Sequence, residues 1–297
     1  MRANVYFTRE ITPEKVVELY RALGVELPGK VAVKVHSGEK GNQNFLRPEF
    51  WCPMVEEVHG TIVECNTAYG DATGGVRDNT ESHLKLIEEH GWNKYFPVDL
   101  LDAQGPDVVW PIPHGKILKE NHLGKNILHY DSMLVLAHFK GHPMGGYGGA
   151  LKQLAIGCAS RAGKALIHSA GKTDDRFKTW EQHASSVVFP EAMADAASSV
   201  IEHFRGKIAF INVMKNLSVD CDCCAVAEDP CMKDIGILAS KDPIAIDQAC
   251  LDLVYGADDP GRDHLIERIE SRNGVHTIES AAALGYGMRE YELVEVE

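Results

Sequence analysis

The chain has 297 residues, of which 44% are hydrophobic and 25% charged, so it has enough apolar material for a core and is not a disordered protein. Its formal net charge of −13 argues against binding to nucleic acids or anionic membranes. No apolar run approaches the roughly 18 residues that cross a bilayer, and the N-terminus has no apolar signal region, so we expect a cytoplasmic protein.

Short apolar runs alternate with helical patterns along the chain. Thr12 and Pro13 are typical of a helix start, and Arg47 and Pro48 precede a second helix that reaches Val58. The predicted strands are 31–35, 61–65, 133–137, 165–167, 207–213 and 235–239, and the further helices are 79–89, 190–204, 243–255 and 262–272. Residues 291–296 alternate like an edge strand. The pattern predicts an α/β fold with a largely parallel, Rossmann-like sheet flanked by helices.

A single domain over residues 1–297 is the simplest organisation, because no internal repeat or long low-complexity tract interrupts the chain. The polar stretch near residues 170–180 is poor in apolar side chains. It is the candidate boundary if the chain divides into two subdomains, and that question is left open.

Cysteines form the first specific signal. The chain has eight, and four of them (Cys221, Cys223, Cys224 and Cys231) lie between residues 221 and 231. A long chain without an export signal is expected to keep its thiols reduced, with some available to a metal ion. Acidic residues flank Cys221 and Cys223, which a hydrophobic core would not select. We therefore favour metal or redox chemistry for this pair, and leave the roles of Cys65, Cys158 and Cys231 open.

Polar side chains follow five of the predicted strands. They are His36, Asn66, His138 with His142, His168, and the cysteine cluster that begins at Cys221. Because ligands in open α/β sheets bind beyond the carboxyl ends of the strands, we expect these side chains to share one cleft. Imidazoles and thiols are ligands that zinc or iron prefers. The alternative is that the thiols are buried as small hydrophobes and the histidines are hydrogen-bonded.

Two further segments suggest anion binding. The glycine-rich run that contains Gly148 and Gly149 precedes Lys152, so it can cradle an anion, although it matches neither common nucleotide-binding motif. Lys40 and Arg47 can bind a carboxylate or phosphate. The alternatives are a flexible turn and a solvated surface loop.

Two aspartates of the helix predicted at 243–255 are assigned structural positions. We place Asp242 at the helix cap and Asp247 on the helix surface, so neither is assigned to catalysis.

Three motifs resemble those of the uncharacterised iron–sulfur-centre proteins, a domain-of-unknown-function family (DUF 362). They are residues 36–42 with 45–48, residues 138–142 with 148–152 and 157–164, and residues 220–223 with 234–240 and 242–248. Many members carry a ferredoxin-like insert with two cysteine quartets between the second and third motifs. This chain has only residues 169–180 there, without a cysteine, and resembles a short form of the family. Cys224 stands where the family usually has Trp, and Cys65 stands where it often has Asp.

A more distant resemblance is to the nickel-pincer lactate racemases. The order and spacing of His142, Lys152 and His168 are similar to those of three of their site residues. The resemblance implies an acid–base role for His142, a cofactor-anchoring role for Lys152 and a metal-binding role for His168. The other catalytic histidine of the racemases has no clear counterpart.

Three functions are therefore left open. The first is a metal-dependent enzyme, an isomerase or oxidoreductase, that acts on a small anionic molecule. The second is an iron–sulfur redox protein with a redox partner, and the third is a non-enzymatic, structural metal-binding protein. The cofactor is a metal ion (Fe, Zn or Ni) or an iron–sulfur cluster, and the sequence is compatible with an oligomer. The assigned residues are His142, Lys152 and His36 for catalysis, Arg47, Lys40, Asn66, Gly148 and Gly149 for substrate, and His138, His168, Cys221, Cys223 and Cys224 for metal.

Overall fold

The computed structural model describes residues 2–70 and 74–297. Within these ranges the strands form an eight-stranded sheet and two small hairpins. The order across the sheet is β12 (Tyr291–Glu295), β1 (Ala3–Thr8), β11 (Gly236–Ser240), β10 (Ile208–Met214), β7 (Ser132–His138), β2 (Val31–Lys34), β3 (Thr61–Glu64) and β4 (Val98–Leu100). β11 runs antiparallel to both neighbours, and the other pairs are parallel. The predicted α/β fold with a largely parallel sheet is confirmed.

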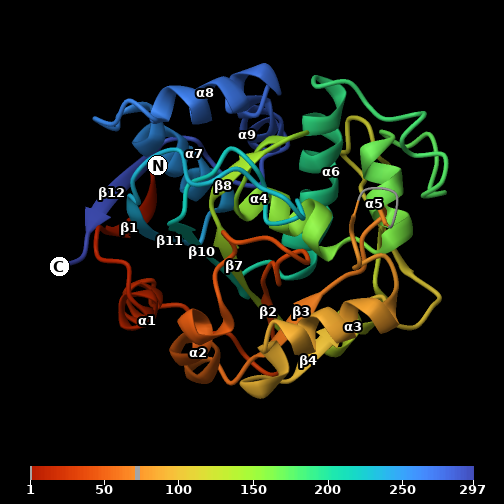
Figure 1. Cartoon of the computed structure of the whole chain (residues 1–297), viewed down its shortest axis with the longest axis horizontal. Helices are drawn as coiled ribbons and strands as arrows, with labels where there is room; N and C mark the ends of the chain where they lie inside the picture. The colour runs from red at the N-terminus through yellow and green to blue at the C-terminus, as the bar shows by residue number, and fades with distance from the viewer. Residues whose placement is uncertain (1, 71–73) are drawn as a thin grey trace.

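Helices cover both faces of the sheet (Figure 1). They are α1 (Pro13–Ala22), α2 (Pro48–Glu57), α3 (Thr80–Glu89), α4 (Ala150–Lys152), α5 (Arg161–His168), α6 (Val188–His203), α7 (Pro243–Tyr255), α8 (Arg262–Ser271) and α9 (Val275–Ala283). Met133 and Val135 of β7 join the core that contains α6 and α7, whereas Leu134 and Leu136 join the core that contains α1 and α2. This alternation of side chains buries both faces of the central strands.

Side-chain caps fix the starts of several predicted helices. Thr12 Oγ1 accepts a hydrogen bond from the backbone N–H of Lys15, and Asn79 Oδ1 accepts one from that of Ser82, at 3.3 and 3.0 Å. Asp242 caps α7 in the same way, as predicted. These side chains satisfy backbone donors that have no partner inside the helix.

Two predictions about local structure were wrong. Residues 165–167 were predicted as a strand but lie in α5, which Ser160 caps through the N–H of Gly163. A short apolar run is compatible with a strand or with a buried helix face, and here the cap at Ser160 favours the helix. Asp247 was placed on a helix surface but is fully buried.

The two small hairpins were not predicted. They are β5 (Val108–Pro111) with β6 (Glu120–Leu123), and β8 (Lys140–His142) with β9 (Gly146–Gly148). Residues 169–187 connect α5 to α6, and a subdomain boundary near 170–180 stays a prediction. None of the helices in the described ranges has the length and apolar character that a membrane span requires.

Candidate active site

A cavity of about 570 Å³ lies beyond the carboxyl ends of the central strands. Residues at or just after the ends of β2 and β3, among them His36 and Glu64, line it together with the β8–β9 hairpin. Cys223 and Cys224, from the loop that follows β10, also line the wall. His168 reaches the cavity from the end of α5 rather than from a strand. The cavity thus brings His36, His142, His168 and Cys223 together, whereas Asn66 and His138, which were expected in the same cleft, do not line it.

Lys152 lies on the cavity wall at the end of α4. Asp247 holds this turn, because its carboxylate accepts hydrogen bonds from the backbone N–H groups of Ala150 and Leu151 at 2.8 and 3.0 Å. Gly149 is required here, since a Cβ at this position would collide with the Asp247 carboxylate. The next turn, Gln153–Gly157, is π-helical, a feature frequent at functional sites. No carboxylate within residues 2–70 and 74–297 lies within ion-pair distance of the Lys152 Nζ, and Lys152 lines the cavity.

His142 is held in one tautomer. Its Nδ1 accepts hydrogen bonds from the backbone N–H groups of Met144 and Gly145, at 3.1 and 2.9 Å. In the neutral ring Nε2 therefore carries the proton, and Nε2 lies 3.8 Å from the Cys223 sulfur. Burial and the nearby Lys152 ammonium lower the pKa of His142 to about 4. The neutral imidazole thus presents a proton to the cavity at neutral pH.

His168 lines the same cavity. Its ring stacks on Phe189 at 4.7 Å, and its buried Nδ1 has no hydrogen-bond partner among the described residues. Burial, with Lys152 and Lys164 nearby, lowers the pKa of His168 to about 3. A buried nitrogen without a partner is costly, so it indicates a site for a ligand or a bound water.

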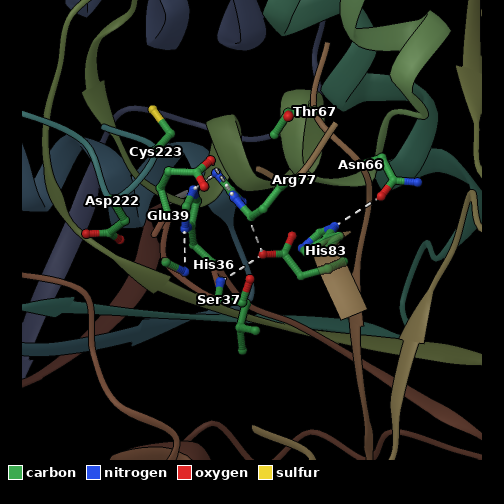
Figure 2. A network of polar contacts seen from close by, with 12 residues as sticks. His36, Ser37, Glu39, Asn66, Thr67, Arg77, His83, Asp222 and Cys223 are labelled. Atoms are coloured by element: carbon green, nitrogen blue, oxygen red, sulfur yellow. Dashed lines mark hydrogen bonds and ion pairs between the residues drawn. The ribbon is translucent and has the colours of Figure 1, made fainter. Parts of the chain in front are cut away.

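His36 is half-buried, and its Nδ1 accepts a hydrogen bond from the Gly38 N–H at 3.1 Å. Burial and the Arg77 guanidinium lower the pKa of His36 well below its ordinary value. Figure 2 shows Arg77 directed at the Glu39 carboxylate with His36 beside the pair. The Arg77–Glu39 ion pair measures 3.1 Å, and the Tyr69 hydroxyl accepts a second hydrogen bond from Arg77 at 2.8 Å.

Glu64 is the buried carboxylate that contacts two cationic side chains of the cavity lining. It pairs with the fully buried Lys34 at 2.8 Å and accepts the backbone N–H of Ser37 at 2.7 Å, and Arg77 lies 3.8 Å away. Burial alone raises the pKa of this carboxyl, but Lys34 and Arg77 outweigh it and lower the pKa to about 2. The carboxylate therefore stays ionised and fixes two cations at the cavity.

His138 lies behind the cavity wall. Its Nδ1 faces both Asp222 oxygens at 3.0 Å, and its Nε2 faces the Lys215 carbonyl. Lys140 pairs with the same Asp222 carboxylate at 3.0 Å. Both ring nitrogens of His138 thus meet hydrogen-bond acceptors, which leaves neither of them free for a metal ion. Its predicted metal-binding role is untested.

The donor atoms of His142, Cys221 and Cys223 lie within 4.8 Å of one another. Two thiols and an imidazole suit a soft or borderline metal ion such as zinc. A metal-binding histidine, however, normally donates its second N–H outward, whereas Nδ1 of His142 accepts two N–H bonds. The thiols therefore fit a metal ion, and the imidazole in this tautomer does not.

The thiols differ in their ionisation. Burial is the main cause that raises the pKa of Cys221 to about 11. The hydrogen bond with Cys221 lowers the pKa of Cys223, but the contact with Cys224 and burial outweigh it and leave this pKa at about 11. The contact with Cys223 lowers the pKa of Cys224. The cluster thus has one thiol that ionises more readily than the others.

The remaining predicted residues lie outside the cavity lining. Lys40 and Arg47 are exposed, and the Arg47 guanidinium lies 3.9 Å above the Phe45 ring. Asn66 is buried, and its side-chain amide bonds Thr80. The structure thus brings His142, Lys152, His168, His36, Gly148, Gly149, Cys223 and Cys224 together, with Cys221 just behind them.

Sequence reasoning missed several cavity residues. Lys34 and Glu64 had a usable signal, because each is a charged residue at the end of a short apolar strand. Arg77 had none, since it lies in an irregular segment. Lys164 was not identified because the segment that follows it, 165–167, was wrongly predicted as a strand instead of part of α5.

Comparison with known proteins identifies the family. No curated protein matches the chain. The chain is similar to the lactate racemase apoprotein from Thermoanaerobacterium thermosaccharolyticum, with 13% identity and a TM-score of 0.40 over 72% of this chain and 51% of that one. It is also similar to a Thermotoga maritima protein of known crystal structure, with 12% identity and a TM-score of 0.42 over 93% of this chain and 60% of that one. The chain thus spans about half to three fifths of the length of these proteins. Residues 31–252 match the family model described as "Domain of unknown function (DUF362)", and the chain belongs to that family.

Proposed function

We propose that the cavity is the active site of an enzyme that acts on a small anionic substrate. The observation that carries this proposal is the Lys152 ammonium, which no carboxylate of the described residues pairs, in a cavity that His142 and His168 also line. A volume of about 570 Å³ lies within the usual range of about 300–1,000 Å³ for small-molecule sites. A carboxylate at Lys152 would lie near both imidazoles, because the Lys152 charge lowers the pKa of each ring.

The imidazoles supply the proposed chemistry. The Nε2–H of His142 can donate a hydrogen bond to a bound anion, because its Nδ1 accepts two backbone N–H groups and Nε2 keeps the proton. His168 offers a nitrogen that no described residue occupies. His36 lies on the same wall and is a third candidate for proton transfer. This arrangement favours an isomerase that moves a proton beside the anionic group, with an oxidoreductase as the alternative.

A metal centre is the second candidate function, and the observation that favours it is that the donor atoms of His142, Cys221 and Cys223 lie within 4.8 Å of one another. Cys221 and Cys223 would hold the ion, with Cys224 beside Cys223 as a further candidate ligand, and the ion would supply Lewis-acid or redox chemistry when bound. An iron–sulfur cluster with a redox partner, a closed structural site and an oligomer stay predictions. A brown protein with visible absorption would favour the cluster, and a colourless protein with stoichiometric zinc would favour the structural site.

The anion site is tested by replacing Lys152 with methionine, which keeps the length of the side chain and removes its charge. We expect binding of lactate or inorganic phosphate to weaken by about tenfold or more, because one direct charge contact contributes about 1.4 kcal/mol or more in a buried site. Isothermal titration calorimetry measures the change. Lys85→Met, on the exposed face of α3, is the matched control and should bind like the wild type. Equal binding by both variants would remove Lys152 from the site.

The metal centre is tested by elemental analysis of protein purified without oxygen. We expect Cys221→Ser and Cys223→Ser to lose the bound metal, since each removes a thiolate ligand from the cluster. Cys52→Ser is the control, because Cys52 lies on α2, away from the cluster. The same metal content in all three variants would defeat the assignment.

A further inference from the structure

Five cationic side chains line the cavity within the described ranges. They are Lys34, Arg77, Lys140, Lys152 and Lys164. Three of them have a carboxylate partner: Lys34 pairs with Glu64 at 2.8 Å, Arg77 with Glu39 at 3.1 Å and Lys140 with Asp222 at 3.0 Å. The other two, Lys152 and Lys164, have no described carboxylate within ion-pair distance. The cavity therefore has two positive charges that the described part of the protein does not neutralise by pairing.

Lys164 is the more deeply buried of these two lysines, with 6% of its surface exposed. Its Nζ donates one hydrogen bond, to the Ala159 carbonyl at 2.6 Å, so two of its three donors remain for another partner. Asp102 and Glu64 act on it only from beyond ion-pair distance. Asp102 already accepts the backbone N–H groups of Asn66 and Arg161, at 2.9 and 3.0 Å. Burial lowers the pKa of Lys164, because a buried ammonium without a paired anion is costly, and an anion supplied by a ligand would offset this cost.

The two lysines have different surroundings. Lys164 lies on α5 and donates to the Ala159 carbonyl, whereas Lys152 ends α4, the turn that Asp247 holds through its hydrogen bonds. The π-helical turn Gln153–Gly157 separates α4 from the loop before α5. The charges of both ammonium groups lower the pKa of His168. The two charges therefore belong to one cavity but to different parts of its wall.

We infer that the ligand of this cavity carries two separated anionic groups, one bound at Lys152 and the other at Lys164. This inference rests on the proposed anionic substrate and narrows it to a dianion. A dicarboxylate and a phosphorylated carboxylate share this chemistry. Each would neutralise both lysines, whereas a monoanion would leave one of them unpaired in a buried wall.

The test compares straight-chain dicarboxylates from oxalate to glutarate with monocarboxylates of the same length, by calorimetry at constant ionic strength. We expect at least one dicarboxylate to bind about tenfold or more tightly than its monocarboxylate counterpart. We expect Lys164→Met to reduce this ratio to about one. Lys164→Gln, which can still donate to the Ala159 carbonyl, is the second variant if the methionine variant folds poorly. Phosphoglycolate, measured beside malonate, distinguishes a phosphate from a second carboxylate.

Three outcomes are informative. A preference for dianions that disappears in the Lys164 variants supports the inference. If the wild type binds monoanions and dianions equally and Lys152→Met binds neither, the inference is overturned but the proposed function stands. Binding that does not depend on Lys152 at all overturns the proposed function as well.

Discussion

Replacing Glu64 with glutamine is expected to lower the free energy of unfolding by about 3–5 kcal/mol, the usual cost of removing one partner of a buried ion pair. The carboxylate is the only described anion within ion-pair distance of the fully buried Lys34 Nζ, and it also accepts the N–H of Ser37. Glutamine keeps the size of the side chain but leaves the Lys34 charge uncompensated. Urea denaturation near pH 7 measures the loss.

The same variant is expected to change the dependence of stability on pH. The pKa of Glu64 falls from its ordinary value of 4.5 to about 2 in the folded protein. The stability that its ionisation contributes is therefore complete above pH 4.5 and is lost as the pH falls towards 2. The difference in unfolding free energy between wild type and Glu64→Gln should shrink over this range.

The control is the double variant Lys34→Met with Glu64→Gln, which removes both charges together. It should recover part of the lost stability, because no buried charge is left unpaired. A Glu64→Gln protein as stable as the wild type, or a difference that stays constant between pH 5 and 2, would contradict the assigned role of the ion pair.

The sequence predicts the fold well where local signals and burial agree. Capping side chains such as Thr12 and Asp242 lie at the starts of their helices, and apolar runs such as 207–213 form buried strands. The prediction failed at 165–167, where three apolar residues carry no period and the cap at Ser160 decides the structure. The β8–β9 hairpin was missed because it lies in a glycine-rich segment and has no alternating pattern of apolar and polar residues.

The candidate site was predictable to the extent that strand ends determine it. His142 and Cys223 follow from the rule that ligands bind at the carboxyl edge of the sheet, whereas Lys152 was assigned from the glycine-rich run before it. The exposed positions of Lys40 and Arg47 did not follow, because their loop turns its backbone to the site and these side chains to solvent. The pairing of charges depends on distances between separate strands, which no spacing in the sequence encodes.

Asp247→Ala is expected to lower the free energy of unfolding by about 3 kcal/mol or more, because it leaves several buried donors without an acceptor. The carboxylate accepts the backbone N–H groups of Ala150 and Leu151, and Asn212 donates to it at 2.8 Å. The variant should also weaken anion binding, since these bonds hold the turn that positions Lys152. Denaturation and calorimetry on the same sample measure both effects.

The pH dependence of Asp247 has the opposite sign to that of Glu64. Burial raises the pKa of Asp247 from its ordinary value of 3.8 to about 6, although its hydrogen-bond donors oppose this. Its contribution to stability is therefore complete below pH 3.8 and is lost as the pH rises through 6. The difference in unfolding free energy between wild type and Asp247→Ala should shrink as the pH rises from 4 to 6.5. A loss of stability with unchanged anion binding would make Asp247 a purely structural residue, whereas a loss of both would connect the buried carboxylate to the position of Lys152.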